Sequence, residues 1–285
     1  MRTWFITGVS RGLGLAIANA ALTEGDTVIG TVRDKAPDLA SGPGKLHVVT
    51  LDVADGEAVD EAVHQAFARA GKIDVIVNNA GYGLLGAFEK ATDAEARRLF
   101  EVDVFAPIRI IRAALPYLRA QRSGHIISIT SIAGRAPGPG SAVYSAAKYA
   151  LEGLSASLAQ EVRPFGVKVT AVAPGAFRTD FLSSHSIRKS DAEDAAYAAT
   201  VGRMMSGFDA MAGKQIGDPD RAAQAILELT RAEQPPIHLL LGTDALRRAR
   251  EKLDLVIEEM DRWEEVTRGT DFPQVEPART AAGGR

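Results

Sequence analysis

Short apolar runs alternate with longer amphipathic stretches along most of the chain. Several short runs are continuous and rich in β-branched residues, which is typical of parallel strands buried on both faces. We expect strands over 4–7, 27–32, 46–51, 73–78, 125–131, 167–172 and 237–241, and helices over 13–24, 56–70, 93–119, 142–162, 219–231 and 243–265. Regular strand–helix alternation predicts an α/β fold, with a doubly wound, Rossmann-like parallel sheet and helices on both faces.

Two regions lie outside this alternation and are expected to be additions to one domain over residues 1–267. Residues from about 178 to 217 are polar and irregular, and a segment of this length predicts a lid over the substrate. From about 243 to 265, apolar residues recur at spacings of three and four. This spacing predicts an amphipathic helix that packs on its own core, caps the active site or joins subunits. Residues 268–285 are rich in Pro, Gly and polar residues and are expected to form a disordered tail.

The composition of the 285 residues excludes several classes of protein. The chain has no cysteine, which excludes disulfide frameworks and thiolate metal sites, and its five histidines have no metal-ligand spacing. The net charge of −3 argues against nucleic-acid binding. No apolar run approaches the roughly 20 residues of a membrane helix, and the first residues lack the apolar stretch of a secretory signal. We therefore expect a cytoplasmic enzyme that acts on a small molecule, with no metal, membrane or nucleic-acid partner.

A glycine-rich turn joins the first expected strand to the first expected helix. Residues 7–14 read TGVSRGLG. Glycines let the backbone approach a pyrophosphate closely, and a helix N-terminus presents free N–H groups to negative charge. The spacing differs from the G-x-G-x-x-G fingerprint of dinucleotide sites. Alone, such a turn is either structural or part of a dinucleotide site, and its position after the first strand favours the second interpretation.

Four further motifs follow the glycine loop in the order and spacing of one family. They are N-N-A-G over 78–81, Ser131 thirteen residues before Tyr144, Y-x-x-x-K over 144–148, and P-G-x-x-x-T over 174–179. With these motifs the chain resembles the short-chain dehydrogenase/reductase family over about residues 2–241. The PGAFRTDF stretch and the additional C-terminal helix resemble the hydroxysteroid and retinol dehydrogenases of that family.

The resemblance implies a nicotinamide cofactor bound along the glycine loop. The expected cofactor-binding residues are Gly8, Ser10, Arg11, Gly12, Leu13, Gly14, Arg33, Asp52, Val53, Asn79, Ala80, Gly81, Tyr144, Lys148, Pro174, Gly175, Phe177 and Thr179. NAD sites hold the ribose hydroxyl with an acidic residue after the second strand, whereas NADP sites place cationic groups there. Arg33 at that point and Arg11 in the glycine loop favour NADP(H) over NAD, because a guanidinium suits phosphate oxygens. Two alternatives stay open: both arginines are solvated surface residues, or Asp34 holds the ribose of NAD.

Tyr144 and Lys148 lie four residues apart on one expected helix and therefore share a face. A free tyrosine has a pKa of about 10, but a nearby ammonium group and an oxidised nicotinamide both favour the phenolate. The resemblance implies that Tyr144 exchanges the proton with the substrate oxygen and that Lys148 lowers the tyrosine pKa and holds the nicotinamide ribose. It also implies that Ser131 orients the substrate oxygen, while the cofactor supplies the hydride.

One position departs from the family pattern. The family commonly has an asparagine in the helix before the catalytic serine, where it is thought to hold a water that links the lysine to solvent. This chain has Asp103 at that position. An ionised aspartate accepts hydrogen bonds but donates none, and its charge would offset that of Lys148. Three interpretations stay open: Asp103 is a working substitute, it marks a slowed or specialised enzyme, or it marks a protein that binds the cofactor without turnover.

The leading interpretation is an NADP(H)-dependent oxidoreductase that interconverts a carbonyl and a secondary alcohol. The substrate would contact Ser131, Tyr144, Phe181 and Met205. An apolar wall of Leu84, Leu85, Phe177, Phe181, Met204, Met205 and Phe208 favours a lipophilic molecule. The alternatives are a cofactor-binding regulatory or sensor protein, which Asp103 would favour, and a scaffolding protein. The resemblance also implies a homodimer paired through the helices near 106–119 and 142–162.

Overall fold

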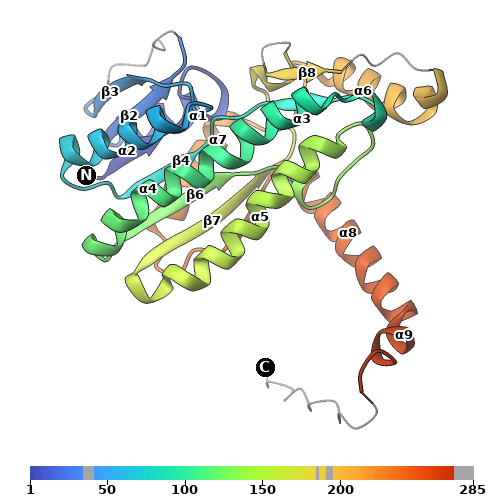
Figure 1. Ribbon diagram of the computed structural model, residues 1–285. Helices are drawn as coiled ribbons and strands as arrows, with labels where there is room; N and C mark the ends of the chain where they lie inside the picture. Colours follow the sequence, from blue (N-terminus) through green and yellow to red (C-terminus); the bar gives the residue numbers. More distant parts are fainter. Residues whose placement is uncertain (35–41, 184–185, 191–194, 273–285) are drawn as a thin grey trace.

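Seven parallel strands form the central sheet (Figure 1). The computed structural model describes residues 1–34, 42–183, 186–190 and 195–272. The strands are β1 (Thr3–Ile6), β2 (Thr27–Val32), β3 (Lys45–Thr50), β4 (Val75–Asn78), β6 (Gly124–Ile129), β7 (Val167–Pro174) and β9 (His238–Leu241). Their order is β3-β2-β1-β4-β6-β7-β9, so the direction of winding reverses between β1 and β4. The doubly wound α/β fold expected from the sequence is confirmed, and ligands of such sheets bind beyond the carboxyl ends of the strands at this reversal.

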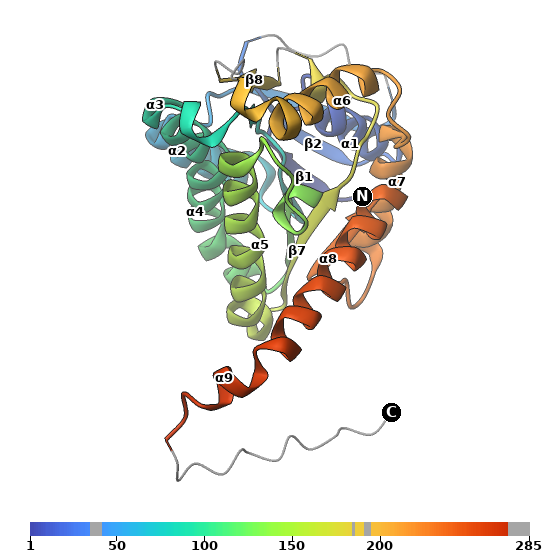
Figure 2. The same cartoon turned by 90° about the vertical axis from the view of Figure 1, so that its right-hand side faces the viewer.

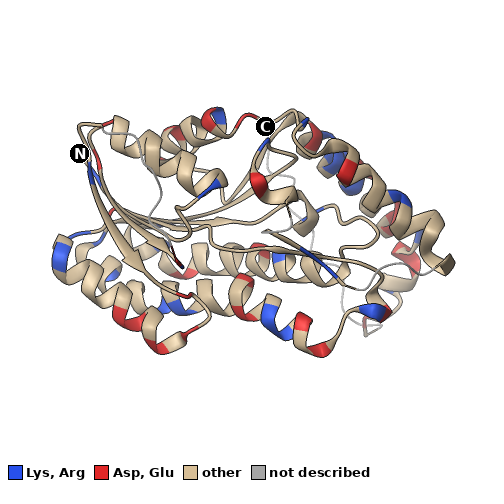
Figure 3. Ribbon diagram, turned by 90° about the horizontal axis from the view of Figure 1, so that it is seen from above, with Lys and Arg blue, Asp and Glu red and all other residues tan. Residues whose placement is uncertain are grey.

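Helices cover both faces of the sheet (Figures 1 and 2). On one face lie α1 (Gly12–Thr23) and α7 (Pro219–Arg231), and on the other lie α2 (Gly56–Ala70), α4 (Ala106–Gln121) and α5 (Ala142–Val162). Successive strand residues point to opposite faces, so Trp4 and Ile6 join the first layer while Phe5 joins the second. Both faces need apolar side chains, which explains why the strands are continuous apolar runs. Figure 3 shows Lys, Arg, Asp and Glu gathered mainly on the helices.

The single helix expected over 93–119 is divided into three parts. α3 (Asp93–Phe100) begins with a capping box in which Thr92 and Glu95 satisfy each other's backbone N–H groups. A π-helical turn over Glu101–Phe105 follows, where the Ala106 N–H donates to the Glu101 carbonyl, and α4 continues to Gln121. Such turns are often found at functional sites, and this one carries Asp103.

The segment expected to be an irregular lid contains regular structure. A small second sheet pairs β5 (Gly83–Leu85) with β8 (Ile187–Lys189), and α6 spans Arg203–Met211. Both lie at the end of the molecule toward which the carboxyl ends of the central strands point (Figure 1). Strands of three residues have too few positions to show a period, so the sequence pattern could not reveal this sheet.

The C-terminal extension packs on the body only at its start. In α8 (Thr243–Arg262), Ala245 and Ala249 are buried against Ile132 and Ala136. Further along, the helix runs away from the body and is followed by α9 (Glu264–Arg268) (Figure 2). Of the three roles expected for this helix, packing on the protein's own core applies to its first two turns, and the other two stay predictions. Residues 273–285 of the expected disordered tail lie outside the described residues. Among the helices of the described residues, none is long and apolar enough to cross a membrane.

Candidate active site

The glycine loop lies between β1 and α1, at the reversal point of the sheet. Gly8 and Gly12 have φ of +73° and +60°, a left-handed conformation that side chains other than glycine rarely adopt. At Gly14, an added Cβ would lie 2.2 Å from the Gly8 carbonyl oxygen and 2.3 Å from Nδ2 of Asn79. Gly14 is a glycine because the loop is folded tightly onto Asn79 and its own backbone, and the loop leads directly into the start of α1.

Asn79 fastens the glycine loop from the next strand. Its Nδ2 donates to the carbonyl oxygens of Thr7 and Gly8 at 2.9 and 3.0 Å. In return, Thr7 Oγ1 accepts the N–H groups of Asn79 and Ala80 at 3.0 and 3.1 Å. The amide of Asn79 is thus engaged with the loop itself, a role that the N-N-A-G motif alone does not reveal.

The cationic position after β2 is exposed. Arg33 Nε lies 3.2 Å from an Asp34 carboxylate oxygen, with both side chains well exposed, so the ion pair is weak and open to competition by a phosphate. Asp52 accepts the Ala54 N–H at 3.0 Å and lies 3.3 Å from Arg98. The Ala54 hydrogen bond and the Arg98 charge lower the pKa of Asp52. The side chain of the next residue, Val53, is buried.

Ser131, Tyr144 and Lys148 meet at the carboxyl end of β6. Tyr144 and Lys148 are buried on α5, and the Lys148 Nζ lies 5.7 Å from the centre of the Tyr144 ring. Lys148 also donates to the Ile129 carbonyl at 3.2 Å, just before the serine. Ser131 caps a short helical turn by accepting the Ala133 N–H at 3.1 Å. The three residues that the sequence placed in one site are therefore together.

The electrostatic surroundings of Tyr144 favour the phenol. Burial and the Asp103 charge raise the pKa of Tyr144, while Lys148 and a hydrogen bond with Ser131 lower it, and the net pKa is above its ordinary value. The expected lowering by Lys148 is present as one contribution, but burial outweighs it. A neutral phenol is the form that donates a proton, which suits reduction of a carbonyl.

Asp103 forms a buried ion pair with Lys148. Its Oδ2 lies 3.1 Å from Lys148 Nζ, and its Oδ1 accepts the Tyr82 N–H at 3.1 Å. Burial raises the pKa of Asp103 despite these two contacts. Burial by itself would lower the pKa of Lys148, but the attraction of Asp103 and Tyr144 raises it above the ordinary value. A Cβ at Gly81 would lie 2.9 Å from Asp103 Oδ2, so this glycine leaves room for the carboxylate.

The loop after β7 is held by a residue that the sequence analysis missed. Asp244, in the first turn of α8, accepts the Ala176 N–H at 2.9 Å. A Cβ at Gly175 would lie 2.2 Å from Asp244 Oδ1, which explains the glycine after Pro174. In the same loop, Thr179 accepts the Phe181 N–H at 3.3 Å. Asp244 was missed because it lies more than sixty residues after this loop, and no local sequence pattern connects the two.

A buried polar cluster supports the backbone next to Ser131. Thr130 donates to Glu152, which also lies 3.1 Å from Arg135 and 2.8 Å from His238 Nδ1. Glu152 follows Tyr144 and Lys148 at the same spacing of four residues and so continues their face of α5. This spacing was the only sequence signal for it. Neither here nor elsewhere in the described ranges could a group of three His, Cys, Asp or Glu side chains hold a metal ion.

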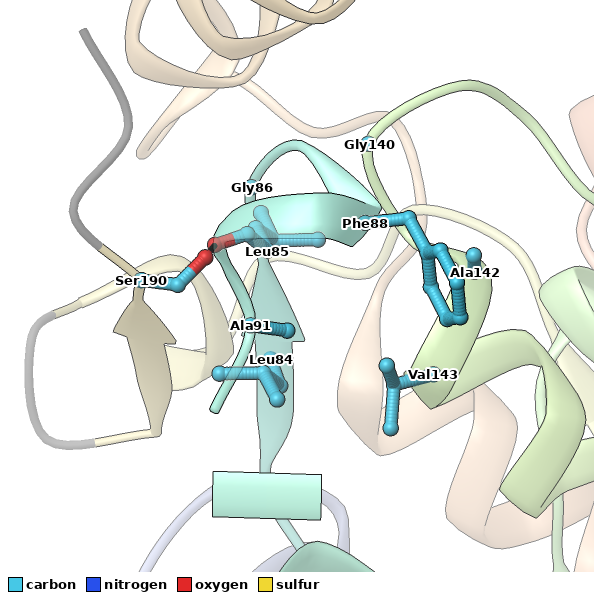
Figure 4. Close-up of a pocket in the computed structure, with 9 residues that line it drawn as sticks. All are labelled: Leu84, Leu85, Gly86, Phe88, Ala91, Gly140, Ala142, Val143 and Ser190. Carbon is cyan, nitrogen blue, oxygen red and sulfur yellow. Dashed lines mark hydrogen bonds between the residues drawn. The ribbon is translucent and has the colours of Figure 1, made fainter. Parts of the chain in front are cut away.

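The expected apolar wall is only partly assembled. Phe181 lies beside Tyr144 with ring centres 6.1 Å apart and is 36% exposed, so a substrate could contact Phe181 next to the buried Tyr144. Leu84 and Leu85 are instead buried in β5, and the small cavity they line with Phe88, Val143 and Ser190 has a volume of about 10 Å³ (Figure 4). This cavity holds a single water at most. Met204 approaches Gly140, and Met205 is half-buried on the same helix, α6.

Known proteins share both the sequence and the fold. Residues 2–190 match the family model described as short chain dehydrogenase. A 3-ketodihydrosphingosine reductase from Bacteroides thetaiotaomicron is 34% identical over 237 residues, covering 83% of this chain and 86% of the relative.

Solved structures extend the similarity across the described fold. The crystal structure of a short-chain dehydrogenase from Streptomyces avermitilis is 43% identical, with a TM-score of 0.86, over 95% of this chain and 100% of that chain. A structure of ElxO with NADP bound is 25% identical, with a TM-score of 0.72, over 86% of this chain and 99% of that chain. Other similar structures hold NADP or NAD. The chain belongs to the short-chain dehydrogenase/reductase family.

Proposed function

We propose that this protein is an NADP(H)-dependent oxidoreductase that interconverts a ketone and a secondary alcohol. The observation that carries the proposal is the buried Tyr144 beside Ser131 and Lys148, at the carboxyl end of β6, which pairs with β4. The tight glycine loop fits a dinucleotide, because three of its positions carry no side chain and it leads into the N-terminus of α1. When bound, the cofactor supplies or accepts the hydride.

The side chains of this chain supply the proton and the orientation. Tyr144 donates its phenolic proton to the carbonyl oxygen during reduction and takes a proton from the alcohol during oxidation. Ser131 donates a hydrogen bond to the same oxygen and fixes its direction. Lys148 favours the phenolate after transfer, because its charge stabilises the negative oxygen. Burial of Tyr144 and Lys148 keeps bulk water from competing for the proton.

The substrate is proposed to be lipophilic. Phe181 provides an apolar surface next to the Tyr144 ring, and the methionines of α6 adapt to varied shapes. The name of the similar 3-ketodihydrosphingosine reductase gives a keto compound as the substrate of that relative. These observations favour a ketone with a large apolar part.

The cofactor is proposed to be NADP(H). Arg33 is exposed after β2, where a ribose phosphate would lie, and its weak pair with Asp34 leaves the guanidinium able to exchange partners. The similar structure that holds NADP supports the same choice.

Two further properties are proposed. We propose the cytoplasm as the compartment, with which the absence of cysteine is compatible. We also propose that the protein is a homodimer paired through α4 and α5.

Oxidation of NADPH and of NADH should be measured with a panel of ketones and aldehydes that differ in apolar chain length. We expect turnover that rises with apolar size, and a kcat/KM at least about tenfold higher with NADPH than with NADH. Equal or better use of NADH would contradict the cofactor assignment. If NADPH binds in a titration but no carbonyl is reduced across the panel, the sensor alternative replaces the enzyme.

Asp103→Asn tests the meaning of the carboxylate beside Lys148. We expect equal or higher kcat, because the amide still accepts the Tyr82 N–H at the same position. Removing the negative charge also removes one cause of the raised pKa of Tyr144, so the pH profile of alcohol oxidation should move to lower pH. The measurement is kcat against pH in both directions.

Asp26→Asn is the matched control for this experiment. Asp26 is also buried, but it holds Trp4 Nε1 at 2.8 Å and the Arg2 N–H at 2.7 Å, at the opposite end of the strands. The Asp26→Asn variant should have a lower free energy of unfolding than the wild type and an unchanged pH profile of kcat. A loss of kcat of more than about tenfold in Asp103→Asn would show that the carboxylate has a role of its own.

A further inference from the structure

The C-terminal helix is long enough to carry an interaction surface away from the body. α8 has 20 residues, and at 1.5 Å per residue it is about 30 Å long. Ala245 and Ala249 are the only residues of α8 that are buried in the described structure. The rest of the helix projects away from the body (Figures 1 and 2).

Large apolar side chains lie exposed along one side of this projecting part. Leu253, Ile257, Met260 and Trp263 are 61%, 54%, 65% and 59% exposed and recur at spacings of three and four. At about 100° per residue, they share one face of the helix. We call these four residues the arm stripe. Leu255 is similarly exposed, at 53%, but lies on the opposite side.

Such a helix is poorly stabilised by itself. The part of α8 after Ala249 has 13 residues. Isolated helices shorter than about 12–15 residues are marginal in water, because most helical stability in proteins comes from packing of an apolar face. An exposed row of large apolar residues also marks an interaction site in most proteins. The arm stripe therefore needs a partner to cover it.

The charges of the helix identify the partner. In the first half, Arg250 and Lys252 make no ion pair within the described residues, and in the second half the same holds for Glu259 and Asp261. From 243 to 253 there are four basic and two acidic residues, whereas from 254 to 268 there are two basic and six acidic residues. Two copies of this helix laid antiparallel bring each basic half against the acidic half of the other.

We propose that the arm stripe docks on the same helix of a second copy of this chain, antiparallel across a two-fold axis. In an isologous contact of this kind, the basic half of each helix faces the acidic half of the other, so every basic–acidic contact occurs twice. Charge distribution also decides against a lipid surface, since the distal half is strongly acidic and would be repelled by anionic headgroups. This contact is additional to the proposed pairing through α4 and α5 and does not depend on the enzyme activity.

Light scattering after size-exclusion chromatography tests the proposal with one matched pair of variants. We expect Leu253→Glu to halve the mass of the assembly relative to the wild type. Leu255→Glu introduces the same charge two residues away, on the opposite side, and should leave the mass unchanged. A wild-type mass retained in Leu253→Glu, or a loss in both variants, would overturn the proposal, as would a monomeric wild type.

Charge exchange gives a second test that alters no apolar residue. Arg250→Glu/Lys252→Glu makes both halves acidic, and Glu259→Lys/Asp261→Lys replaces the negative charges that would face Arg250 and Lys252 of the second copy with positive ones. Each variant alone should have half the wild-type mass, and an equimolar mixture should recover the full mass as a mixed assembly. A mixture that stays at half mass would contradict the antiparallel arrangement. Binding of the wild type, but not of Leu253→Glu, to vesicles of anionic lipid would assign the stripe to a membrane instead.

Discussion

Tyr144→Phe is expected to lower kcat for carbonyl reduction by about 10²–10⁴-fold, the range that general acid–base catalysis contributes. The ring, its burial and its contact with Phe181 remain, so the site keeps its shape and loses only the proton donor. The affinity for NADPH, measured by fluorescence titration, should change little. Steady-state turnover with the best carbonyl of the panel gives the comparison.

Tyr149→Phe is the control for this substitution. Tyr149 lies on the same helix, is 44% exposed and donates its hydroxyl to the Arg135 carbonyl at 2.7 Å. Removing that hydroxyl should leave kcat within about a factor of three, since a hydrogen bond of this kind contributes about 1 kcal/mol to stability and none to proton transfer. If Tyr144→Phe retained more than about a tenth of the wild-type kcat, another group would be the proton donor.

Lys148→Met is expected to damage both activity and folding. The variant loses the charge that stabilises the Tyr144 phenolate, and kcat should fall by about 10²–10⁴-fold. It also leaves Asp103 as an uncompensated carboxylate in the interior. Breaking a buried pair in this way costs about 3–5 kcal/mol of unfolding free energy, which urea denaturation would measure.

The double variant Lys148→Met/Asp103→Asn separates the two effects. The neutral amide needs no ammonium partner, so most of the stability should return while kcat stays low. Lys168→Met serves as the control, because Lys168 donates to the Ala232 carbonyl at 2.8 Å on the far side of the sheet. A Lys148→Met protein as stable as the wild type would show that the buried pair is not ionised.

The alternation of strands and helices could be predicted from the sequence because apolar periodicity decides it. The expected bounds of the seven central strands agree with the structure within two residues, and 142–162 and 219–231 were predicted as observed. The site motifs lie at strand ends, and parallel strands bring their carboxyl ends together whatever their separation along the chain. Ser131, Tyr144 and Lys148 could therefore be placed in one site without coordinates.

Contacts between distant segments could not be predicted in this way. Asp244 supports the site from α8, and nothing near it in sequence marks that role; Glu152 supports it from the middle of α5, marked only by its spacing of four residues from Lys148. The apolar wall was misjudged for a related reason. Leu84 and Phe181 are equally apolar, but only the packing of β5 decides that the first is buried at 3% while the second is open at 36%.

The π turn has a consequence for how this part of the chain tolerates insertions and deletions. It adds one residue to a helical turn, and one residue corresponds to a rotation of about 100° in an ordinary helix. This shift in phase lets one nearly continuous helix serve two separate cores: Leu99 before the turn is buried with Tyr144, and Ile110 after it is buried beneath α2. Deleting any one of residues 101–105 would restore a regular helix and bring the two flanks out of register. Length in this segment is therefore constrained more strictly than the identity of its surface residues.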